Sequence, residues 1–173
     1  LNLRQEFSKL QTEEIGSSMR VGLDLNSGIF SFRYDLPSFP YELEEADLWY
    51  LEPALYGEYR YRGKYADLIT GLRWDNYLLE EASVQQAVDP RVSARFFLTD
   101  SIRLIGATGL TSQTPLPRER SEGNDGDPDL QLERSWQNSF GVQQELLAGA
   151  LRWQLVGYYN ELYDLVVGRE DRF

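Results

Sequence analysis

The sequence predicts an all-β protein: an antiparallel, up-and-down sheet that forms part of the wall of a transmembrane β-barrel. Apolar and polar residues alternate in about eight segments, which is the period of a strand with one apolar face. The connections between these segments alternate short and long, as in barrels with brief turns at one rim and long loops at the other. Tyr (11) and Trp (4) are also plentiful among the 173 residues, and both concentrate at membrane interfaces.

We expect strands near 1–11, 18–34, 48–62, 64–79, 89–99, 101–112, 133–147 and 150–167. The short connections are expected at 12–17, Gly63, Asp100 and Ala148–Gly149. The longer ones, which contain Pro, Gly, Asp and Glu, are expected at 35–47, 80–88, 113–132 and after Gly168. Turn-forming residues at these places favour chain reversals between strands.

Five of the predicted strands separate apolar side chains onto one face. These faces consist of Met19, Val21, Leu23 and Leu25; Trp49, Leu51, Pro53, Leu55, Gly57, Tyr59 and Tyr61; Ala66, Leu68, Leu72 and Trp74; Val92, Ala94, Phe96 and Leu98; and Leu151, Trp153, Leu155 and Tyr159. The segment 101–112 is less regular, because Ile105 and Ala107 share a face with Arg103.

Aromatic residues are spaced along the apolar faces as a membrane-spanning strand requires. A tilted strand needs roughly 9–11 residues to cross the hydrocarbon, and Trp49 is followed on its face by Tyr59, as Trp153 is by Tyr163. Trp49, Trp74 and Trp136 lie toward the long-loop ends, whereas Tyr59, Tyr61 and Trp153 lie toward the short-turn ends. The pattern predicts two aromatic girdles with an apolar band between them.

The opposite faces are too charged for a dry core. They carry Glu52, Glu58, Arg60, Arg62, Asp67, Arg73, Asp75, Arg95, Arg103, Glu145 and Arg152. Burying an unpaired charge costs several kcal/mol, so we expect these side chains to face a wide lumen that holds water or a polar filling. The complete barrel should therefore be large.

Composition excludes several functions. The formal net charge of -11 disfavours nucleic acid as a partner, because phosphate binding needs a basic surface. The sequence has no Cys and no His, so it offers no disulfide and no Ser-His or Cys-His nucleophile. We expect no catalytic residues, no resident metal and no cofactor.

The sequence also lacks a helical membrane span and an export signal. No run of about 18 apolar residues occurs, and the chain begins at Leu1 within what reads as a strand. A protein bound for an outer membrane needs a signal. We therefore interpret residues 1–173 as an internal fragment.

Several stretches resemble the barrel domain of TonB-dependent outer-membrane receptors. They are Tyr65–Tyr77 (YADLITGLRWDNY), Asp89–Arg95 (DPRVSAR), Gly109–Pro117 (GLTSQTPLP), Gly126–Ser135 (GDPDLQLERS) and Tyr158–Val166 (YYNELYDLV). They occur in the family's order. In the fourth stretch, Asp127 stands where the family usually has Asn, and Leu132 where it usually has Pro.

The resemblance implies an outer-membrane receptor with a barrel of about 22 strands filled by an N-terminal plug. Residues 1–173 would then be one part of the barrel domain, and the plug and the C-terminal strands would lie outside this sequence. Such a receptor imports a scarce nutrient, such as an iron-siderophore, cobalamin, a sugar or another metal chelate. Its partners would be outer-membrane lipid, the small-molecule ligand and, through the plug, the TonB complex.

Ligand selection would then fall to lumen side chains and to the loops at 35–47, 80–88 and 113–132. Arg118 and Arg120 lie in the longest of these loops. They are the candidate ligand-binding residues, because a guanidinium group matches a carboxylate or phosphate.

Two other interpretations remain open from the sequence. One is a self-contained eight-stranded outer-membrane barrel with a structural or adhesive role. The other is a soluble binding module of the lipocalin or β-sandwich type. The charge crowded onto the inner faces disfavours the first, and the aromatic spacing disfavours the second.

Overall fold

A computed structural model describes residues 1–9, 15–32, 46–80, 82–120, 127 and 129–165. Within these residues the chain forms eight strands, whose bounds are β1 Asn2–Lys9, β2 Gly16–Phe32, β3 Ala46–Arg62, β4 Ala66–Leu79, β5 Gln85–Phe97, β6 Ile102–Gln113, β7 Glu133–Leu146 and β8 Leu151–Tyr163. A short helix, α1 (Pro117–Arg120), follows β6, and a 3₁₀ turn, η2 (Leu147–Gly149), joins β7 to β8.

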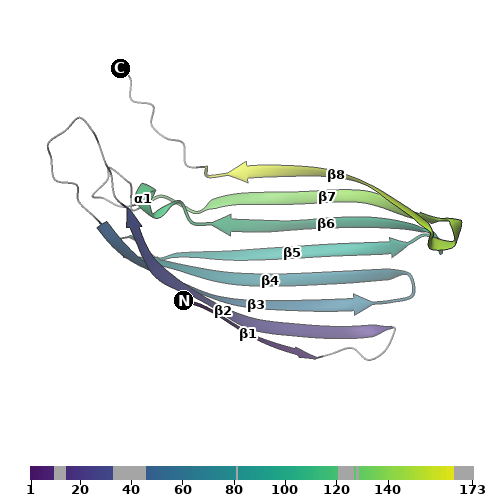
Figure 1. Ribbon diagram of the computed structural model, residues 1–173, viewed down its shortest axis with the longest axis horizontal. Helices are drawn as coiled ribbons and strands as arrows, with labels where there is room; N and C mark the ends of the chain where they lie inside the picture. Colours follow the sequence, from purple (N-terminus) through teal and green to yellow (C-terminus); the bar gives the residue numbers. More distant parts are fainter. Residues whose placement is uncertain (10–14, 33–45, 81, 121–126, 128, 166–173) are drawn as a thin grey trace, which may run out of the picture.

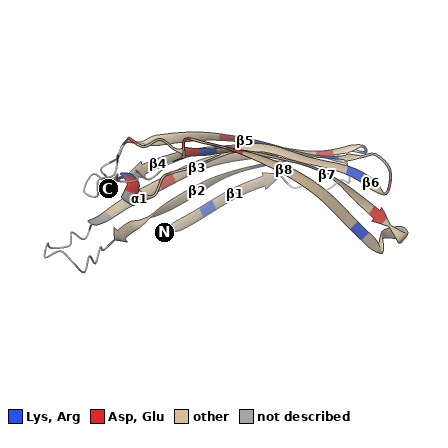
Figure 2. Ribbon diagram, turned by 90° about the horizontal axis from the view of Figure 1, so that it is seen from above, with Lys and Arg blue, Asp and Glu red and all other residues tan. Residues whose placement is uncertain are grey.

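The eight strands make one antiparallel sheet in chain order, from β1 to β8. Every strand pairs with the strand before it, so the topology is up-and-down throughout (Figure 1). Seen edge-on, with the strands running across the view, the sheet is curved and forms an open trough (Figure 2). The predicted fold class is therefore confirmed, and the single sheet excludes the β-sandwich interpretation for the described residues.

Short turns gather at one end of the trough, which we call the short-turn rim (Figure 1). Between β3 and β4, the amide of Gly63 donates to the carbonyl of Ala66 at 2.8 Å. In η2, Leu147 and Gly149 both adopt positive φ, at 52° and 91°, which reverses the chain within three residues. The helix α1 and the described residues between β4 and β5 lie at the opposite end, the long-loop rim (Figure 1).

Two prolines lie inside strands, and each coincides with a gap in one ladder. The β3–β4 register passes from Leu51 to Ala54, so it omits Pro53. The β5–β6 register begins at Arg91, directly after Pro90. Proline has no N–H to donate, so a strand accepts it where one side is not fully paired.

On the N-terminal side of Pro90, where the β5–β6 ladder is absent, the side chain of Asp89 joins the two strands. The carboxylate of Asp89 accepts from the amide of Ser112 at 2.9 Å and from its hydroxyl at 2.8 Å. The Asp89–Pro90 pair thus removes one backbone donor and supplies a side-chain acceptor beside it.

Two predicted strand boundaries were wrong by four residues. We expected a loop over 80–88, but β5 begins at Gln85, and Gln85 and Ala87 pair with Tyr77 and Asp75 of β4. The two glutamines carry a loop-like polar pattern, yet they extend because β4 continues beside them and offers hydrogen-bonding partners. The end of β8 differs by the same amount, because β8 ends at Tyr163 and the strand was expected to continue to 167. The other described strand ends lie within two residues of the predicted ones.

The apolar faces all lie on the convex side of the trough. Register places Trp49, Leu55, Phe96 and Trp153 on this side, with 46%, 48%, 52% and 41% of each residue exposed. Monomeric soluble proteins rarely show an apolar patch of this extent. A hydrocarbon environment removes the cost of exposing it, at about 25 cal/mol per Å² of apolar surface.

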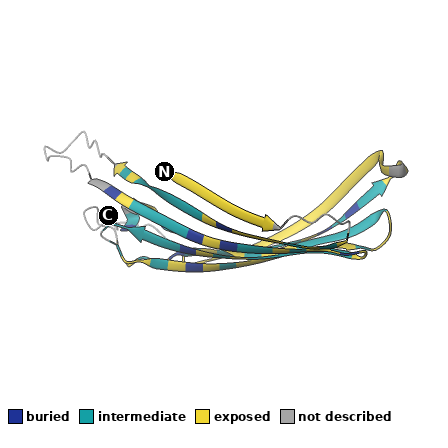
Figure 3. Cartoon of the chain, turned by 90° about the horizontal axis from the view of Figure 1, so that it is seen from below, coloured by how far each residue is buried: buried dark blue, intermediate teal, exposed yellow. Residues whose placement is uncertain are grey.

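The two edge strands are the least covered parts of the sheet. Most of β1 and β8 is exposed, whereas the buried positions lie in the strands between them (Figure 3). An unpaired strand edge leaves backbone N–H and C=O groups open to further pairing. In the described residues no helix is long and apolar enough to cross a membrane.

A matched pair of substitutions on β8 tests which side faces lipid. Leu155 is on the convex side and Tyr158 on the concave side, and both are well exposed, at 67% and 82%. We expect Leu155→Arg to destabilise the intact protein in phospholipid vesicles by about 1–3 kcal/mol, because a charge between the interface and the bilayer middle loses much of its hydration. Tyr158→Arg should change the stability by less than about 1 kcal/mol.

The measurement is the urea midpoint of unfolding from vesicles. Equal effects of the two substitutions would contradict the assignment of the convex side to lipid.

Candidate functional site: the charged concave wall

The inward-facing side chains of the eight strands form one hollowed surface, which we call the concave wall. A cavity of about 760 Å³ lies against it and is lined by Glu58 of β3 at one side and by Tyr158 and Asn160 of β8 at the other. Because β3 and β8 are far apart in the sheet, their side chains can line the same hollow only on the concave side. The predicted polar faces therefore point inward, which leaves the apolar faces outward.

Arg73 links three strands of this wall. Asp24 of β2, Ala54 of β3 and Asp75 of β4 are neighbours in register. The guanidinium group of Arg73 contacts Asp24 at 2.6 Å and Asp75 at 2.8 Å, so it crosses β3 above Ala54. The small methyl group beneath it is only 4% exposed.

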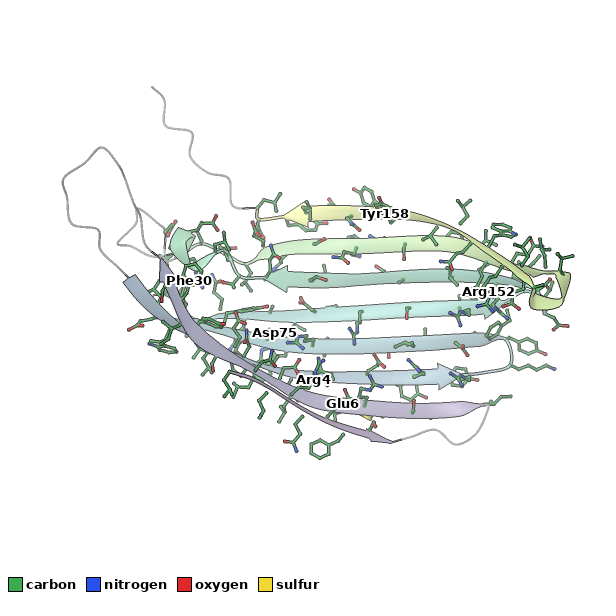
Figure 4. All side chains as sticks on the ribbon, in the orientation of Figure 1. Arg4, Glu6, Phe30, Asp75, Arg152 and Tyr158 are labelled. Carbon is green, nitrogen blue, oxygen red and sulfur yellow. The ribbon has the colours of Figure 1, made fainter. Side chains whose placement is uncertain are left out.

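Arg4 extends this network to β1. Its Nε donates to Asp24 at 2.8 Å, so Asp24 lies between two guanidinium groups. Charge-assisted hydrogen bonds of this kind are about twice as strong as neutral ones. Figure 4 labels Arg4 and Asp75 at the two ends of the network.

Tyr56 crosses a glycine in the same manner. Its ring lies over Gly22, where an added Cβ would be 2.3 Å from Cζ. Its hydroxyl donates to Glu6 of β1 at 2.9 Å, and Gly22 is in register with both residues. A side chain larger than hydrogen at position 22 would therefore block the contact between β3 and β1.

Arg91 repeats the arrangement two strands further on. Its guanidinium group lies over Gly71, with 2.8 Å between Nε and an added Cβ, and contacts Glu58 of β3 at 3.2 Å. Since Glu58, Gly71 and Arg91 are neighbours in register, a small residue again separates a long side chain from its acidic partner.

A third ion cluster lies at the short-turn rim. Arg103 and Arg152 both contact the same Oε1 atom of Glu145, at 2.7 and 2.6 Å. Figure 4 places Arg152 beside the turn between β7 and β8. The cluster ties β6, β7 and β8 together where the sheet has no long loops.

The predicted ligand-binding residues lie at the long-loop rim, in α1. Arg120 is fully buried, and its Nη2 donates to the carbonyl of Ser83 at 2.7 Å. Burial lowers the pKa of this guanidinium, and the negative charge of Asp129 opposes the shift. Arg118 belongs to α1 as well, but its side chain lies outside the described residues.

Arg120 also lines a cavity of about 240 Å³, together with Phe30, Tyr50, Glu52 and Tyr77. Figure 4 labels Phe30 at this end of the sheet. The pocket combines aromatic rings with one cation and one anion. The ligand role of Arg118 and Arg120 stays a prediction.

Two of the predicted ligand loops meet at this rim. Besides the contact of Arg120 with Ser83, the side-chain amide of Gln85 donates to the carbonyl of Leu130. Leu132 and Pro115 are buried beside them. Most of the third loop, 35–47, lies outside the described residues.

The described residues include no group of three His, Cys, Asp or Glu side chains that is placed to hold a metal ion. The carboxylates of the concave wall instead bind arginines, as at Asp24 and Glu145. At these positions the wall therefore presents paired charges.

The family described as "TonB dependent receptor-like, beta-barrel" matches residues 6–172. The chain belongs to this family. TonB-dependent receptors are transport receptors, so membership accounts for the apolar convex side and the charged concave wall together. The resemblance seen in the sequence is confirmed, and the concave wall is the lumen wall of a TonB-dependent receptor barrel.

Solved structures share the fold of this TonB-dependent receptor barrel. They include the FrpB iron transporter from Neisseria meningitidis (TM-score 0.71, 10% identity, 96% of this chain covered) and the alcaligin outer-membrane receptor FauA from Bordetella pertussis (0.67, 14%, 93%). The copper transporter OprC is similar too (0.67, 17%, 92%). The chain spans 28%, 28% and 30% of their lengths, respectively. No curated sequence matches the chain significantly.

The three-strand links were not predicted from the sequence. The alternation of residues assigns Arg73, Asp24 and Tyr56 to one face, but their contacts depend on the register between strands. The small residues at inward positions, such as Gly22, Ala54 and Gly71, could have indicated these links. A small residue leaves room for a long side chain from the next strand to cross it.

Removing the central cation should loosen the wall. We expect Arg73→Met to destabilise the intact receptor by about 1–3 kcal/mol, because Asp24 and the buried Asp75 lose a charged hydrogen-bond donor. Arg91→Met, which removes one longer contact from a more exposed side chain, should have a smaller effect. Thermal unfolding in detergent measures both, and an equal loss in the two variants would contradict the bridging role of Arg73.

A substitution at Gly22 should act through Tyr56. We expect Gly22→Val to displace the Tyr56 ring and lower the unfolding temperature, because the new side chain would occupy the space of the ring. In a Tyr56→Ala background the same substitution should cost markedly less, since the collision no longer occurs. Additive effects in this double-mutant cycle would show that Gly22 is required for another reason.

Proposed function

We propose that this chain is part of the wall of an outer-membrane barrel of about 22 strands that imports a scarce nutrient. An iron-siderophore, cobalamin or another metal chelate is the class of cargo we favour. The observation that carries the proposal is the family match over residues 6–172. Energy would come from the TonB complex, which would act on a plug that fills the lumen.

The two sides of the sheet support a transport role in an outer membrane. The convex side offers lipid an apolar surface with aromatic residues toward both rims, such as Trp49 and Tyr59. The concave wall offers water and solutes a charged surface whose ions are held by partners, such as Asp24 and Arg73. A lining of this kind stays hydrated, so a polar chelate can pass along it.

The open edges of the sheet support a larger barrel. β1 and β8 are the ends of the strand order, and backbone groups at a free edge are not tolerated in hydrocarbon. We therefore infer that further strands of the receptor pair with both edges and close the wall. In this arrangement the plug and those strands belong to the parts of the receptor outside residues 1–173.

The relatives support the class of cargo. They are an iron transporter, an alcaligin receptor and a copper transporter. Ligand selection would take place at the long-loop rim, where α1 and the aromatic residues Phe30, Tyr50 and Tyr77 line a pocket. Arg118 and Arg120 are the residues we propose for an anionic part of the ligand.

Nutrient uptake tests the proposal directly. The intact receptor is expressed in a strain that lacks its own receptors, and growth is followed on a panel of ferric, cupric and cobalt chelates. We expect at least one chelate to support growth only when both the receptor and TonB are present. Growth that does not depend on the receptor, or uptake that persists without TonB, would contradict the proposed role.

A further inference from the structure

The positive charge on the concave wall is unevenly compensated. Toward the long-loop rim, Arg4, Arg73 and Arg91 each contact a carboxylate at 3.2 Å or less. Toward the short-turn rim, a second cavity of about 480 Å³ is lined by Arg60, Arg62 and Arg95, with Asp67 as its acidic residue. Among the described residues, three guanidinium groups thus line a cavity with one carboxylate, whose Oδ1 atom is itself buried without a hydrogen-bond donor.

The pairing within this second cavity is weak. Arg62 approaches Asp67 only to 4.0 Å. Among the described residues, neither Arg60 nor Arg95 has a carboxylate within ion-pair distance. The Nε of Arg60 is buried and has no hydrogen-bond partner among them. Leaving a buried donor without an acceptor is destabilising, so an added acceptor would be stabilising.

The register explains why the space between these arginines is open. The inward row that begins at Arg60 continues through Ile69 to Ser93, Ala107 and Ser139. Three small residues therefore form the floor. The adjacent inward row contains Arg62, Asp67 and Arg95, so the guanidinium groups stand around a shallow floor.

Further donors line the same space. The hydroxyl groups of Ser93 and Ser139 and the amides of Gln143 and Gln154 belong to the cavity lining. Guanidinium groups bind carboxylate and phosphate through paired N–H donors, and hydroxyl and amide groups satisfy remaining oxygens. The chemistry of the lining is that of an anion site.

We propose that Arg60, Arg62 and Arg95 form an anion-binding site on the lumen wall, which holds a carboxylate or phosphate group of a small ligand as it moves toward the short-turn rim. This inference rests on the proposed import function, because import is what would bring the ligand into the lumen. The site lies at the level of Tyr59 and Tyr61 on the convex side, which are the strand neighbours of Arg60.

Continuity with the larger cavity favours a moving small ligand. Ile69, Ser93, Ala107 and Ser139 line both cavities, so the two hollows form one groove along the strands. In the larger cavity Arg73 and Arg91 are neutralised by carboxylates. An anion that travels along the groove first passes arginines that are paired with carboxylates. Only in the second cavity does it meet arginines that have no carboxylate partner among the described residues.

Binding of simple anions to the intact receptor tests the site. Citrate and inorganic phosphate are titrated by calorimetry at low ionic strength, with the neutral sugar raffinose as the uncharged probe. We expect citrate to bind, raffinose not to bind, and the citrate Kd to rise at least tenfold in an Arg60→Gln, Arg95→Gln double variant. The affinity should also fall with added salt.

Two variants make the comparison specific. Arg152→Gln removes the same charge from the same wall at a residue that is paired with Glu145, so it should leave the citrate Kd within twofold. An Arg60→Lys, Arg95→Lys double variant keeps the charge and should retain most of the affinity. The heat-dependent shift in gel mobility of folded barrels checks that each variant folds.

The contrary outcomes are distinct. An equal loss of citrate affinity in the Arg152→Gln variant would show that any positive charge on the wall has the same effect. That result would contradict the proposed site. Absence of citrate and phosphate binding in the wild type, with lower stability of the glutamine double variant, would mean that an acidic side chain of the receptor itself fills the site.

The growth assay separates this inference from the proposed function. TonB-dependent growth that is unchanged in the glutamine double variant would remove the anion site from transport and leave the import role intact. Charge-dependent citrate binding without any receptor-dependent growth would support the site and contradict import.

Discussion

The alternation of side chains in paired strands is the constraint on which the rest of this structure depends. Successive residues point to opposite sides, so the register of each pair decides at once which residues meet lipid and which line the lumen. A slip of one residue would bring Arg73 to the convex side and Leu72 to the concave wall. Hydrocarbon offers no hydrogen bonds to a displaced backbone or charge, so the correct register is strongly favoured.

On the concave wall, register also decides which charges are paired. A long side chain contacts an acid two strands away only where the intervening residue is small. Ala54 under Arg73, Gly22 under Tyr56 and Gly71 under Arg91 meet this condition. These links brace the curved sheet from the inside, because each one joins strands that share no backbone hydrogen bonds. Among the described residues, Arg60 and Arg95 have no such link, and both line the cavity near the short-turn rim.

Much of the fold could be predicted from the sequence, because alternation is local. The strand positions, the apolar faces and the shared face of Ile105, Ala107 and Arg103 follow from residues within one segment. The start of β5 could not be predicted in this way, because Gln85 adopts an extended conformation only where β4 continues beside it. The contact of Arg120 with Ser83 also escaped prediction, because it joins two loops that are distant in the sequence.

The Asp89–Pro90 junction has a mechanical consequence. On the long-loop side of this junction, the carboxylate of Asp89 joins β5 to β6 where the backbone ladder is absent. The pairing of β6 with β7 continues to Gln113. The gap at Pro53 lies in the same half of the sheet. Two of the ladders are therefore interrupted toward the long-loop rim, whereas the described pairing of these strands is continuous toward the short-turn rim. Separating these strands at the long-loop rim would break fewer backbone hydrogen bonds than separating them at the short-turn rim.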